Sequence, residues 1–307
     1  MKNSGLFLVC VLAWGTTWYA ITFQLGDVPI SWSVCYRFLL AALVLGGICK
    51  ITKRWFKLSW RQHSCLCFQG LCICCVPYWL IYESEKLISS GLTAVLTTTI
   101  LYFNVLIRWL WLRAPLRVSV IAGGVVGTAG VLMIFVPEIL GRDNQSFLGI
   151  VMVLSGSFFI SVGGVASEKN KPMGIDAWQG SSLMMLYGAL IIGSFALLTD
   201  EPVAFDVSFS YVASLLYLVL VGSLIAMTCY LMLIRSAGAD RAGYVDVAYP
   251  VVALGVSTLF EGYCWDCQSV IGVIAILVGN MIALCSIDYS AWVDKWVLRR
   301  KTPSKHH

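Results

Sequence analysis

Two ionisable residues lie inside apolar stretches of this chain and could do chemistry there. Arg37 lies within DVPISWSVCYRFLLAALVLGG (27–47), and Asp246 lies within RAGYVDVAYPVVALGVSTLFEG (241–262). An arginine fork could hold an anionic group of a ligand through paired hydrogen bonds, or tie its helix to a neighbour through carbonyls or an acid such as Glu83. If these stretches cross a bilayer, an ionisable side chain at that depth is a candidate functional residue.

Polar and aromatic residues recur at helical spacing in the same kind of stretch. Side chains three or four positions apart share a helix face, which groups Ser90, Thr93, Thr97 and Asn104 in 88–111, and Asp246, Pro250, Ala253 and Ser257 in 242–260. In a bilayer such faces turn toward the interior of a helix bundle. The candidate substrate-facing residues are therefore Trp14, Trp18, Arg37, Thr97, Tyr102, Asn104, Asp246, Tyr249, Pro250 and Ser257.

A purely structural role for these residues stays open. Hydroxyl groups can bond to carbonyls of their own helix, and small residues let helices approach closely. Trp14 and Trp18, one turn apart, could face lipid or core. Pro250 lacks a backbone N–H, so it leaves a carbonyl free to bind something or to flex. Asp246 lies near the start of its apolar stretch, where water could reach it.

The elements that must position these residues are membrane-spanning helices. The chain has 307 residues, 59% of them hydrophobic and 12% charged, with a mean hydropathy of +0.83, whereas soluble domains carry about 25% charged residues. A bilayer core of about 30 Å needs about 20 helical residues to cross. Runs of near that length recur at 5–23, 31–49, 63–82, 88–111, 118–136, 147–166, 178–198, 212–234, 242–260 and 268–287. We therefore predict an all-α membrane protein with ten transmembrane helices.

The distribution of positive charge predicts the orientation of these helices. With a cytoplasmic N-terminus, eighteen of the 21 Lys and Arg fall on the cytoplasmic side, Lys86 and Arg142 fall on the other side, and Arg37 lies within a span. Short loops are the setting in which this bias sets topology. Both termini are therefore expected in the cytoplasm, in a bacterial inner membrane. The net charge of +5 marks the inner membrane face and does not indicate a nucleic-acid partner.

Twelve cysteines are present, and five of them crowd SCLCFQGLCICCVPYW (64–79). Within a span, free cysteine behaves as a small apolar residue. Cys264 and Cys267 are different, because the predicted topology places them near the outer surface, where a CxxC pair could be oxidised or bind a metal. With three histidines in the chain and no second pair of ligands, we expect no metal site and no cofactor; whether the pair is oxidised stays open.

The two halves of the chain resemble each other weakly. An offset of 148 residues places Ala94 on Ala242, Tyr102 on Pro250, Arg113 on Glu261 and Gly124 on Gly272. Five helices per half is an odd number, so the second half must enter the membrane in the opposite orientation. Inverted repeats of this kind are typical of secondary transporters, which bind substrate near the membrane midplane between the halves.

Several motifs in this order resemble the EamA-type transporters of the drug/metabolite transporter superfamily, over about residues 5–288. The first helix has a Trp-Gly pair (Trp14, Gly15), the second has Pro29 followed by Arg37, and the ninth has Pro250 and a closing Glu261. The first repeat departs from the family pattern, because Tyr102 and Arg113 stand where a Pro and a Glu are usual. We therefore expect a stiffer fourth helix than in relatives.

The resemblance implies two five-helix repeats, expected at 1–145 and 146–290, followed by a basic cytoplasmic tail at 291–307. It also implies a non-enzymatic secondary transporter of a small amino-acid-like or amphipathic solute, with export as the expected direction and a proton or counter-solute as a possible coupling partner. Glu83 and Glu261, near the predicted outer ends, are gate candidates. A channel or assembly subunit is the alternative. The sequence contains no HExxH motif and no GxxxxGK[ST] loop, which disfavours a membrane enzyme and an ATP-driven pump.

The predicted topology can be tested by labelling single introduced cysteines, in a cysteine-reduced background, with an impermeant thiol reagent. We expect residues 200–206 to be labelled from outside and residues 50–61 to be protected, because the positive-inside rule places the second loop in the cytoplasm. Strong outside labelling of 50–61, or none at 200–206, would reverse the orientation.

Overall fold

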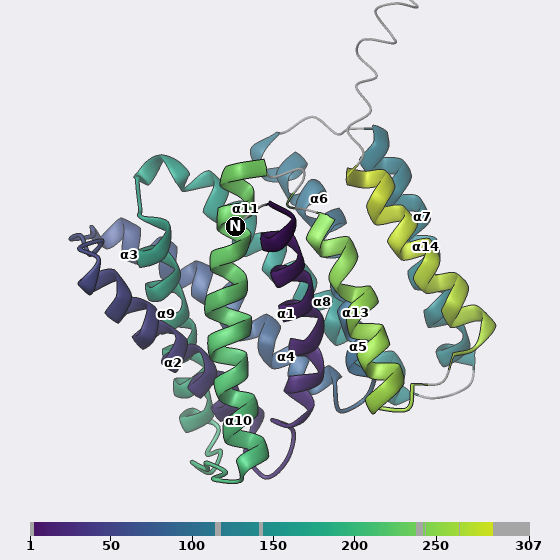
Figure 1. Cartoon of the computed structure of the whole chain (residues 1–307), viewed down its shortest axis with the longest axis horizontal. Coiled ribbons are helices and arrows are strands. Elements are labelled where there is room, and N and C mark those ends of the chain that lie inside the picture. The colour runs from purple at the N-terminus through teal and green to yellow at the C-terminus, as the bar shows by residue number, and fades with distance from the viewer. Residues whose placement is uncertain are drawn as a thin grey trace, which may run out of the picture.

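The computed structural model describes residues 3–113, 118–140, 144–237, 242, 244–263 and 265–284, and every regular element in these ranges is helical (Figure 1). The α-helices are α1 (Asn3–Thr22), α2 (Ile30–Ile51), α3 (Trp60–Gln69), α4 (Val76–Ser84), α5 (Ser90–Thr97), α6 (Ile100–Leu112), α7 (Val118–Leu140), α8 (Asn144–Lys169), α9 (Ala177–Leu198), α10 (Phe209–Tyr217), α11 (Ala226–Ala237), α13 (Tyr244–Phe260) and α14 (Cys267–Leu284). The remaining elements are the π-helical turns η1 (Gly70–Cys75) and η3 (Leu218–Ile225) and the 3-10 turn η2 (Lys171–Met173).

Ten apolar spans can be assembled from the described helices. Eight are long and apolar enough to cross a membrane, namely Asn3–Thr22, Ile30–Ile51, Trp60–Ser84, Ser90–Leu112, Gln145–Lys169, Ala177–Leu198, Phe209–Tyr230 and Cys267–Leu284. Two shorter apolar helices, Val118–Met133 and Tyr244–Phe260, complete the set. The predicted all-helical fold with ten spans is confirmed. The end of the predicted run 268–287 and the predicted tail 291–307 lie outside the described residues, and the limits of the two repeats stay a prediction.

Side-chain caps fix where several of the helices begin. Ser59, Ser89, Asp176 and Ser208 each accept a hydrogen bond from a backbone N–H in the first turn of the following helix. At α3 the bonds are reciprocal, because the Gln62 side chain also accepts from the Ser59 backbone N–H. Such a capping box satisfies two otherwise unpaired groups. It starts the third span at Trp60, three residues before the predicted run at 63.

The fourth span is interrupted despite its lack of proline. Its helix ends at Thr97 and resumes at Ile100. The hydroxyls of Thr97, Thr98 and Thr99 donate to carbonyls three or four residues earlier, at 2.7 Å each. Bonds of this kind compete with the backbone pattern and bend helices. The fourth span is therefore interrupted at Thr98–Thr99, close before Tyr102, whereas its stiffness relative to that of relatives stays a prediction.

The third span of each repeat contains a π-helical turn at the corresponding place. The turn η1 begins at Gly70 and η3 begins at Leu218, which is the repeat offset of 148. Widening the helix by one residue leaves a carbonyl without its usual partner, and in η3 the Ser223 hydroxyl donates to the carbonyl of Leu218 at 3.1 Å. Such turns are rare in proteins overall, and those that occur are often found at functional sites. Both halves therefore share an irregular backbone feature as well as a helix order.

Helices of one repeat pair with their counterparts in the other. The second helices, α2 and α9, pack along each other on one side of the bundle, and the fifth helices, α7 and α14, do so on the other side (Figure 1). The first helix of one repeat, α1, packs against α11 and α13 of the second, while α8 packs against α4 and α6 of the first. Exchanging the two repeats leaves this pattern unchanged. The arrangement is consistent with the predicted inverted repeats.

Glycines allow the α7–α14 pair to approach with its backbones almost in contact. A Cβ added at Gly279 would lie 2.6 Å from the carbonyl oxygen of Gly123 and 2.6 Å from the backbone nitrogen of Gly127. Lipid tails are as apolar as the helices themselves, so close packing of this kind drives association between membrane helices. The pair holds the two repeats together at one edge of the bundle.

Replacing Gly279 with Ala should therefore separate α7 from α14 and lower stability by about 1–3 kcal/mol. The measurement is the thermal midpoint of the purified protein in detergent. Gly47→Ala on α2 is the matched control, because the added methyl group meets no atom within 4 Å. Equal midpoints for the two variants would contradict backbone contact as the basis of this pairing.

Candidate functional site

A cavity of about 240 Å³ lies between the two repeats. Its walls come from α1, α2, η1, α4, α5 and α6 of the first half and from α8, η3, α11 and α13 of the second. The lining residues are Trp14, Thr17, Trp18, Ile21, Arg37, Ile73, Tyr78, Ile81, Thr97, Ile100, Ile160, Gly222, Met227, Asp246 and Tyr249. The helix pairs α2–α9 and α7–α14 flank this cavity, and of these four helices only α2 contributes a described lining residue.

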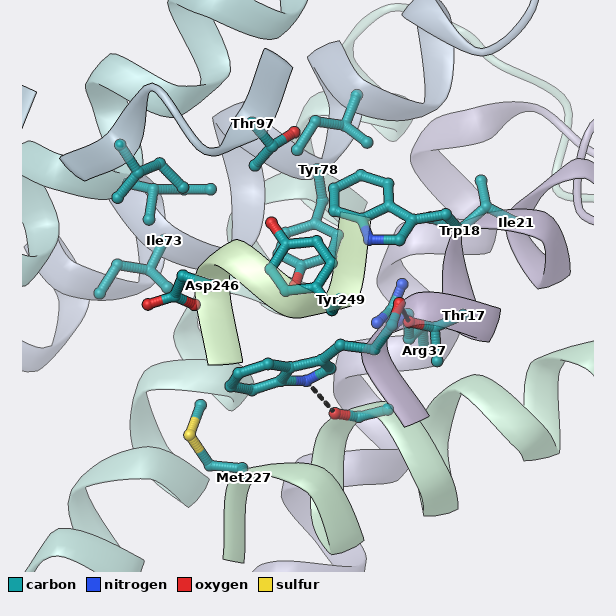
Figure 2. A pocket seen from close by; sticks show the side chains of 15 residues that line it. Thr17, Trp18, Ile21, Arg37, Ile73, Tyr78, Thr97, Met227, Asp246 and Tyr249 are labelled. Atoms are coloured by element: carbon teal, nitrogen blue, oxygen red, sulfur yellow. Dashed lines mark hydrogen bonds between the residues drawn. The ribbon is translucent and has the colours of Figure 1, made fainter. Parts of the chain in front are cut away.

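Aromatic rings form much of the wall. Trp18 stacks on Tyr249 with ring centroids 6.2 Å apart, and Trp14 lies 5.0 Å from the ring of Tyr230 and 6.3 Å from that of Tyr249. The Trp14 indole N–H donates to the carbonyl of Gly222 at 3.3 Å, which is the dashed line in Figure 2. That bond joins α1 to η3. The rings are thus held across the interface of the two repeats, ready to contact an apolar or cationic group.

Arg37 is 4% exposed and lies at one side of the cavity. Its Nη1 donates to the hydroxyl of Tyr82 at 3.2 Å, and its guanidinium lies 4.8 Å from the centroid of the Tyr78 ring. The nearby Glu83 instead pairs with Lys86 at 3.0 Å. Arg37 therefore ties α2 to α4 through aromatic residues, and Nε has no partner among the described residues. These contacts fit the structural role, while its place in the lining leaves contact with a substrate open.

Asp246 lies on the opposite side of the cavity from Arg37 (Figure 2). The Tyr230 hydroxyl donates to its carboxylate at 3.5 Å, the one hydrogen bond that its side chain makes in the described part of the chain. Arg37 and Asp246 are thus separated, one basic and one acidic, with aromatic rings between them. The arrangement can accommodate a small solute with charged groups at its two ends.

The structure brings together six of the ten predicted substrate-facing residues: Trp14, Trp18, Arg37, Thr97, Asp246 and Tyr249. It places the other four outside the lining. Pro250 is buried within α13, the Ser257 hydroxyl donates to Glu261, and the ring of Tyr102 packs toward Gly124 of α7. Asn104 lies near Gly164 of α8. For these four, a role in substrate contact stays a prediction.

Sequence reasoning missed lining residues of two kinds. Thr17 could have been found, because it lies three residues after Trp14 and four before Ile21 on the same helix face. Tyr78, Met227 and the isoleucines gave no signal, because apolar and aromatic residues in a span occur equally on lipid-facing surfaces. Tyr78 is the most consequential omission, since it stacks on Arg37.

Two acids, Glu85 and Glu261, lie close enough to interact electrostatically near the predicted outer end of the bundle. Glu261 accepts hydrogen bonds from the backbone N–H of Ser90, at 3.1 Å, and from the hydroxyl of Ser257, and so links α13 to the first turn of α5. Glu85 follows the third span, is 8% exposed, and neither of its carboxyl oxygens has a hydrogen-bond partner among the described residues. Burial raises the pKa of Glu85, the negative charge of Glu261 adds to this, and Arg37 opposes it.

Removing the Arg37 fork should destabilise the fold, because Tyr82 and Tyr78 lose their shared partner. We expect Arg37→Lys, which keeps the charge but loses the planar fork, to lower stability by about 1–2 kcal/mol, and Arg37→Ala to lower it further. Thermal midpoints in detergent provide the measurement. Arg54→Lys is the control, since Arg54 pairs with Asp176 at a half-exposed site. Unchanged stability of Arg37→Ala would exclude the structural role.

Comparison with known proteins places this architecture in a family. The EamA-like transporter family matches residues 3–136 and 147–285, one match for each half of the chain. Protein PagO of Salmonella typhimurium is 23% identical over 285 residues, covering 92% of each chain. The uncharacterized inner membrane transporter YedA of Escherichia coli (strain K12) is 25% identical over 261 residues, covering 84% of this chain and 82% of YedA.

A third relative, the uncharacterized transporter YoaV of Bacillus subtilis, is 23% identical over 276 residues, covering 90% of this chain and 92% of YoaV. A solved crystal structure has the same fold, with a TM-score of 0.63 at 17% identity, covering 92% of this chain and 96% of the other. The family match spans almost the whole chain, and members of this family are membrane transporters. This chain belongs to the EamA-like transporter family and is a multi-pass, non-enzymatic membrane transporter of the drug/metabolite transporter superfamily.

Proposed function

We propose that this transporter moves a small, amphipathic, amino-acid-like solute by alternating access through the central cavity, and that it works in the direction of export. The observation that carries the proposal is the cavity itself, which both repeats line and which has Arg37 and Asp246 on opposite sides. Substrate sites at the interface of inverted repeats are a general feature of secondary transporters.

The cavity supports a narrow class of substrates. Its volume of about 240 Å³ falls just below the range of about 300–1,000 Å³ found for drug-sized ligands. Stacked rings at Trp18 and Tyr249 favour an apolar or aromatic body. An acid on one side and a guanidinium on the other complement the amino and carboxylate groups of a zwitterion. Substrates of amino-acid size and polarity fit these features best.

The conformational change would be a rocking of one half against the other. Hydrogen bonds that cross the halves near the predicted outer end support a closed layer there: Glu261 with Ser90, and Gln24 with the carbonyl of Tyr211 at 2.9 Å. Breaking such bonds and forming equivalents at the other end would expose the cavity alternately. The inverted repeat makes two such states similar in energy, because each half can adopt the shape of the other.

We further propose that the protein resides in a bacterial inner membrane with both termini in the cytoplasm. The inner-membrane relative YedA and the distribution of Lys and Arg support this orientation. The partners would then be the lipid bilayer, the solute and a coupling species, either a proton or a counter-solute.

Counterflow in proteoliposomes tests the proposed function. Vesicles loaded with an unlabelled amino acid should accumulate the labelled form transiently. With solute on both sides of the membrane, the carrier changes between its two access states with solute bound in each direction, which is faster than returning empty. Labelled amino acids, nucleoside-like metabolites and organic cations would be compared. A channel would instead give flux that neither saturates nor responds to solute on the far side, which would overturn the carrier mechanism.

Pro250 offers a test of the rocking motion. As a proline, it cannot donate the helical hydrogen bond to the carbonyl of Asp246, four residues earlier, so α13 is loosened beside the cavity. Pro250→Ala restores that bond and should slow turnover by about tenfold with a smaller change in substrate affinity. The comparison is of counterflow rate with binding affinity. Gly255→Ala on the same helix is the control, since its added methyl group meets no atom within 4 Å. Equal losses of rate and affinity would argue against a hinge.

A further inference from the structure

A groove lies on the side of the bundle where α3 and α9 pack together, apart from the central cavity (Figure 1). Its volume is about 510 Å³, and we call it the α3–α9 groove. Six residues from Trp60 to Leu71 form one wall, and Tyr187 and Ile191 of α9 form the other. It shares no lining residue with the central cavity. It joins the two halves of the chain, because α3 belongs to the first half and α9 to the second.

The depth of the groove corresponds to one leaflet of a bilayer. The third span begins at Trp60, and Leu71, the last lining residue of that span, is eleven residues further along. At a helical rise of about 1.5 Å per residue, Leu71 lies about 16 Å deeper, which is about half of a hydrocarbon core of about 30 Å. The wall near this deep end is apolar, with Phe68, Leu71 and Ile191. An acyl chain of a single leaflet therefore matches the groove in both length and polarity.

The shallow end of the groove is polar and aromatic. Nδ1 of His63 and the hydroxyl of Tyr187 form a hydrogen bond of 2.6 Å that links α3 to α9. When the phenol donates to Nδ1, the ring proton is on Nε2, and Nε2 makes no hydrogen bond in the described part of the chain. The ring centroid of His63 lies 6.4 Å from that of Trp60. Trp60 is 88% exposed, as expected of a tryptophan at the level of the lipid headgroups.

Positive charge surrounds this shallow end. The segment 50–61 contains no acidic residue and five basic ones, namely Lys50, Lys53, Arg54, Lys57 and Arg61. Arg54 pairs with Asp176, whereas Arg61 is exposed and makes no ion pair within the ranges that the structure describes. Arg61 shares a helix face with the lining residues Ser64 and Phe68, three and seven positions later. Basic clusters beside a span attract anionic lipid headgroups.

We propose that the α3–α9 groove is a binding site for one anionic phospholipid. Its acyl chain lies along Phe68, Leu71 and Ile191, and its phosphate is held by the Arg61 guanidinium and by Nε2 of His63. The planar fork of arginine binds phosphate through two parallel N–H donors, and the histidine adds a third donor. The lipid contacts both halves of the chain, so its binding should stabilise their present arrangement.

Charge favours a lipid over a second copy of the chain as the occupant. Subunits of a two-fold dimer present the same surface to each other, and in a membrane both copies have their basic ends on the same side. Pairing through this groove would bring two 50–61 segments together, each with five basic residues and no acid. Such like-charge contacts oppose association, whereas an anionic phospholipid compensates the same charges.

The test compares two phospholipids with identical dioleoyl tails. Native mass spectrometry of the full-length protein, released from detergent, counts the bound molecules of phosphatidylglycerol, which is anionic, or of phosphatidylcholine, which carries no net charge. We expect one bound phosphatidylglycerol per protein, with an affinity at least about fivefold higher than that of phosphatidylcholine. It should also raise the thermal midpoint more, because a ligand that binds the folded state stabilises it. Inorganic phosphate should not displace it, because the acyl chain supplies part of the binding.

Two variants test the two ends of the site. Arg61→Gln should weaken binding of phosphatidylglycerol about fivefold and leave that of phosphatidylcholine unchanged. Its matched control is Lys86→Gln, which removes the same charge just beyond the other end of the same span. Cys67→Phe fills the middle of the groove and should abolish retention of phosphatidylglycerol, whereas Leu43→Phe on the exposed face of α2 should not. Thermal midpoints without added lipid show whether each variant is folded.

Equal retention of the two lipids, or an unchanged preference in Arg61→Gln, would overturn the anionic headgroup site. Phosphatidylglycerol that stays bound to folded Cys67→Phe, or that inorganic phosphate displaces, would show that the groove holds no acyl chain. A lipid-free dimer that Cys67→Phe prevents would identify a second copy as the occupant. None of these measurements uses transport, so a failure here leaves the proposed function to the counterflow test.

Discussion

The lipid bilayer imposes one constraint on which the rest of this structure depends: backbone polar groups have no water to bond and must be satisfied within the protein. Helices meet this requirement, and they account for all the described regular structure. Departures from helix are therefore informative. Within the described spans, they occur at η1, at η3, at Thr98–Thr99, and at the carbonyl that Pro250 leaves without its helical donor. Every one of these places borders the cavity, through Ile73, Gly222, Thr97 with Ile100, and Asp246 with Tyr249 respectively.

This coincidence has a physical reason. Irregular backbone at membrane depth is tolerated where protein or a cavity, rather than lipid, surrounds it. The same irregular segments can change shape at lower cost than a straight helix, because their hydrogen bonds are already incomplete. The flanking pairs α2–α9 and α7–α14 are by contrast continuous helices. The molecule thus combines rigid pairs at its two edges with weakened helices around the site, a division suited to rocking about a central cavity.

The sequence predicts the fold well because span length, loop charge and repeat order are strong one-dimensional signals. Ten apolar runs identified ten spans, and a handful of residues identified the family. The site was predicted less completely. Polar residues at depth, such as Arg37, Asp246 and Thr97, stand out against an apolar background. Tyr78 and Met227 do not, because the sequence cannot tell which apolar face turns inward. Tyr102 corresponds to Pro250 in the repeat, but this correspondence does not show which way its side chain points, and its ring packs toward α7.

The interruption at Thr98–Thr99 also shows that the two repeats weaken their fourth helices with different residues. The second repeat uses Pro250 where the first has Tyr102, and the first recovers a break through threonine hydroxyls that bond back to the preceding turn. Sequence comparison of single positions suggested a stiffer helix, whereas the three residues act together. A helix can therefore be interrupted by a local cluster of residues, which a position-by-position comparison overlooks.

The chemistry of the site depends on where the two repeats differ. Helix order, π-helical turns and mid-helix breaks recur in both halves, so the backbone is close to symmetric. The charged side chains do not recur. At an offset of 147 or 148, Arg37 corresponds to Met184 or Met185 in α9, and Asp246 corresponds to Thr98. A symmetric cavity would present the same groups to a solute from both sides and would bind it in two opposite orientations equally well. One guanidinium and one carboxyl group lie on opposite sides, so one side of the cavity is basic and the other is acidic. In the proposed mechanism, the repeated backbone gives the two access states similar energies, and the unrepeated charges orient the bound solute.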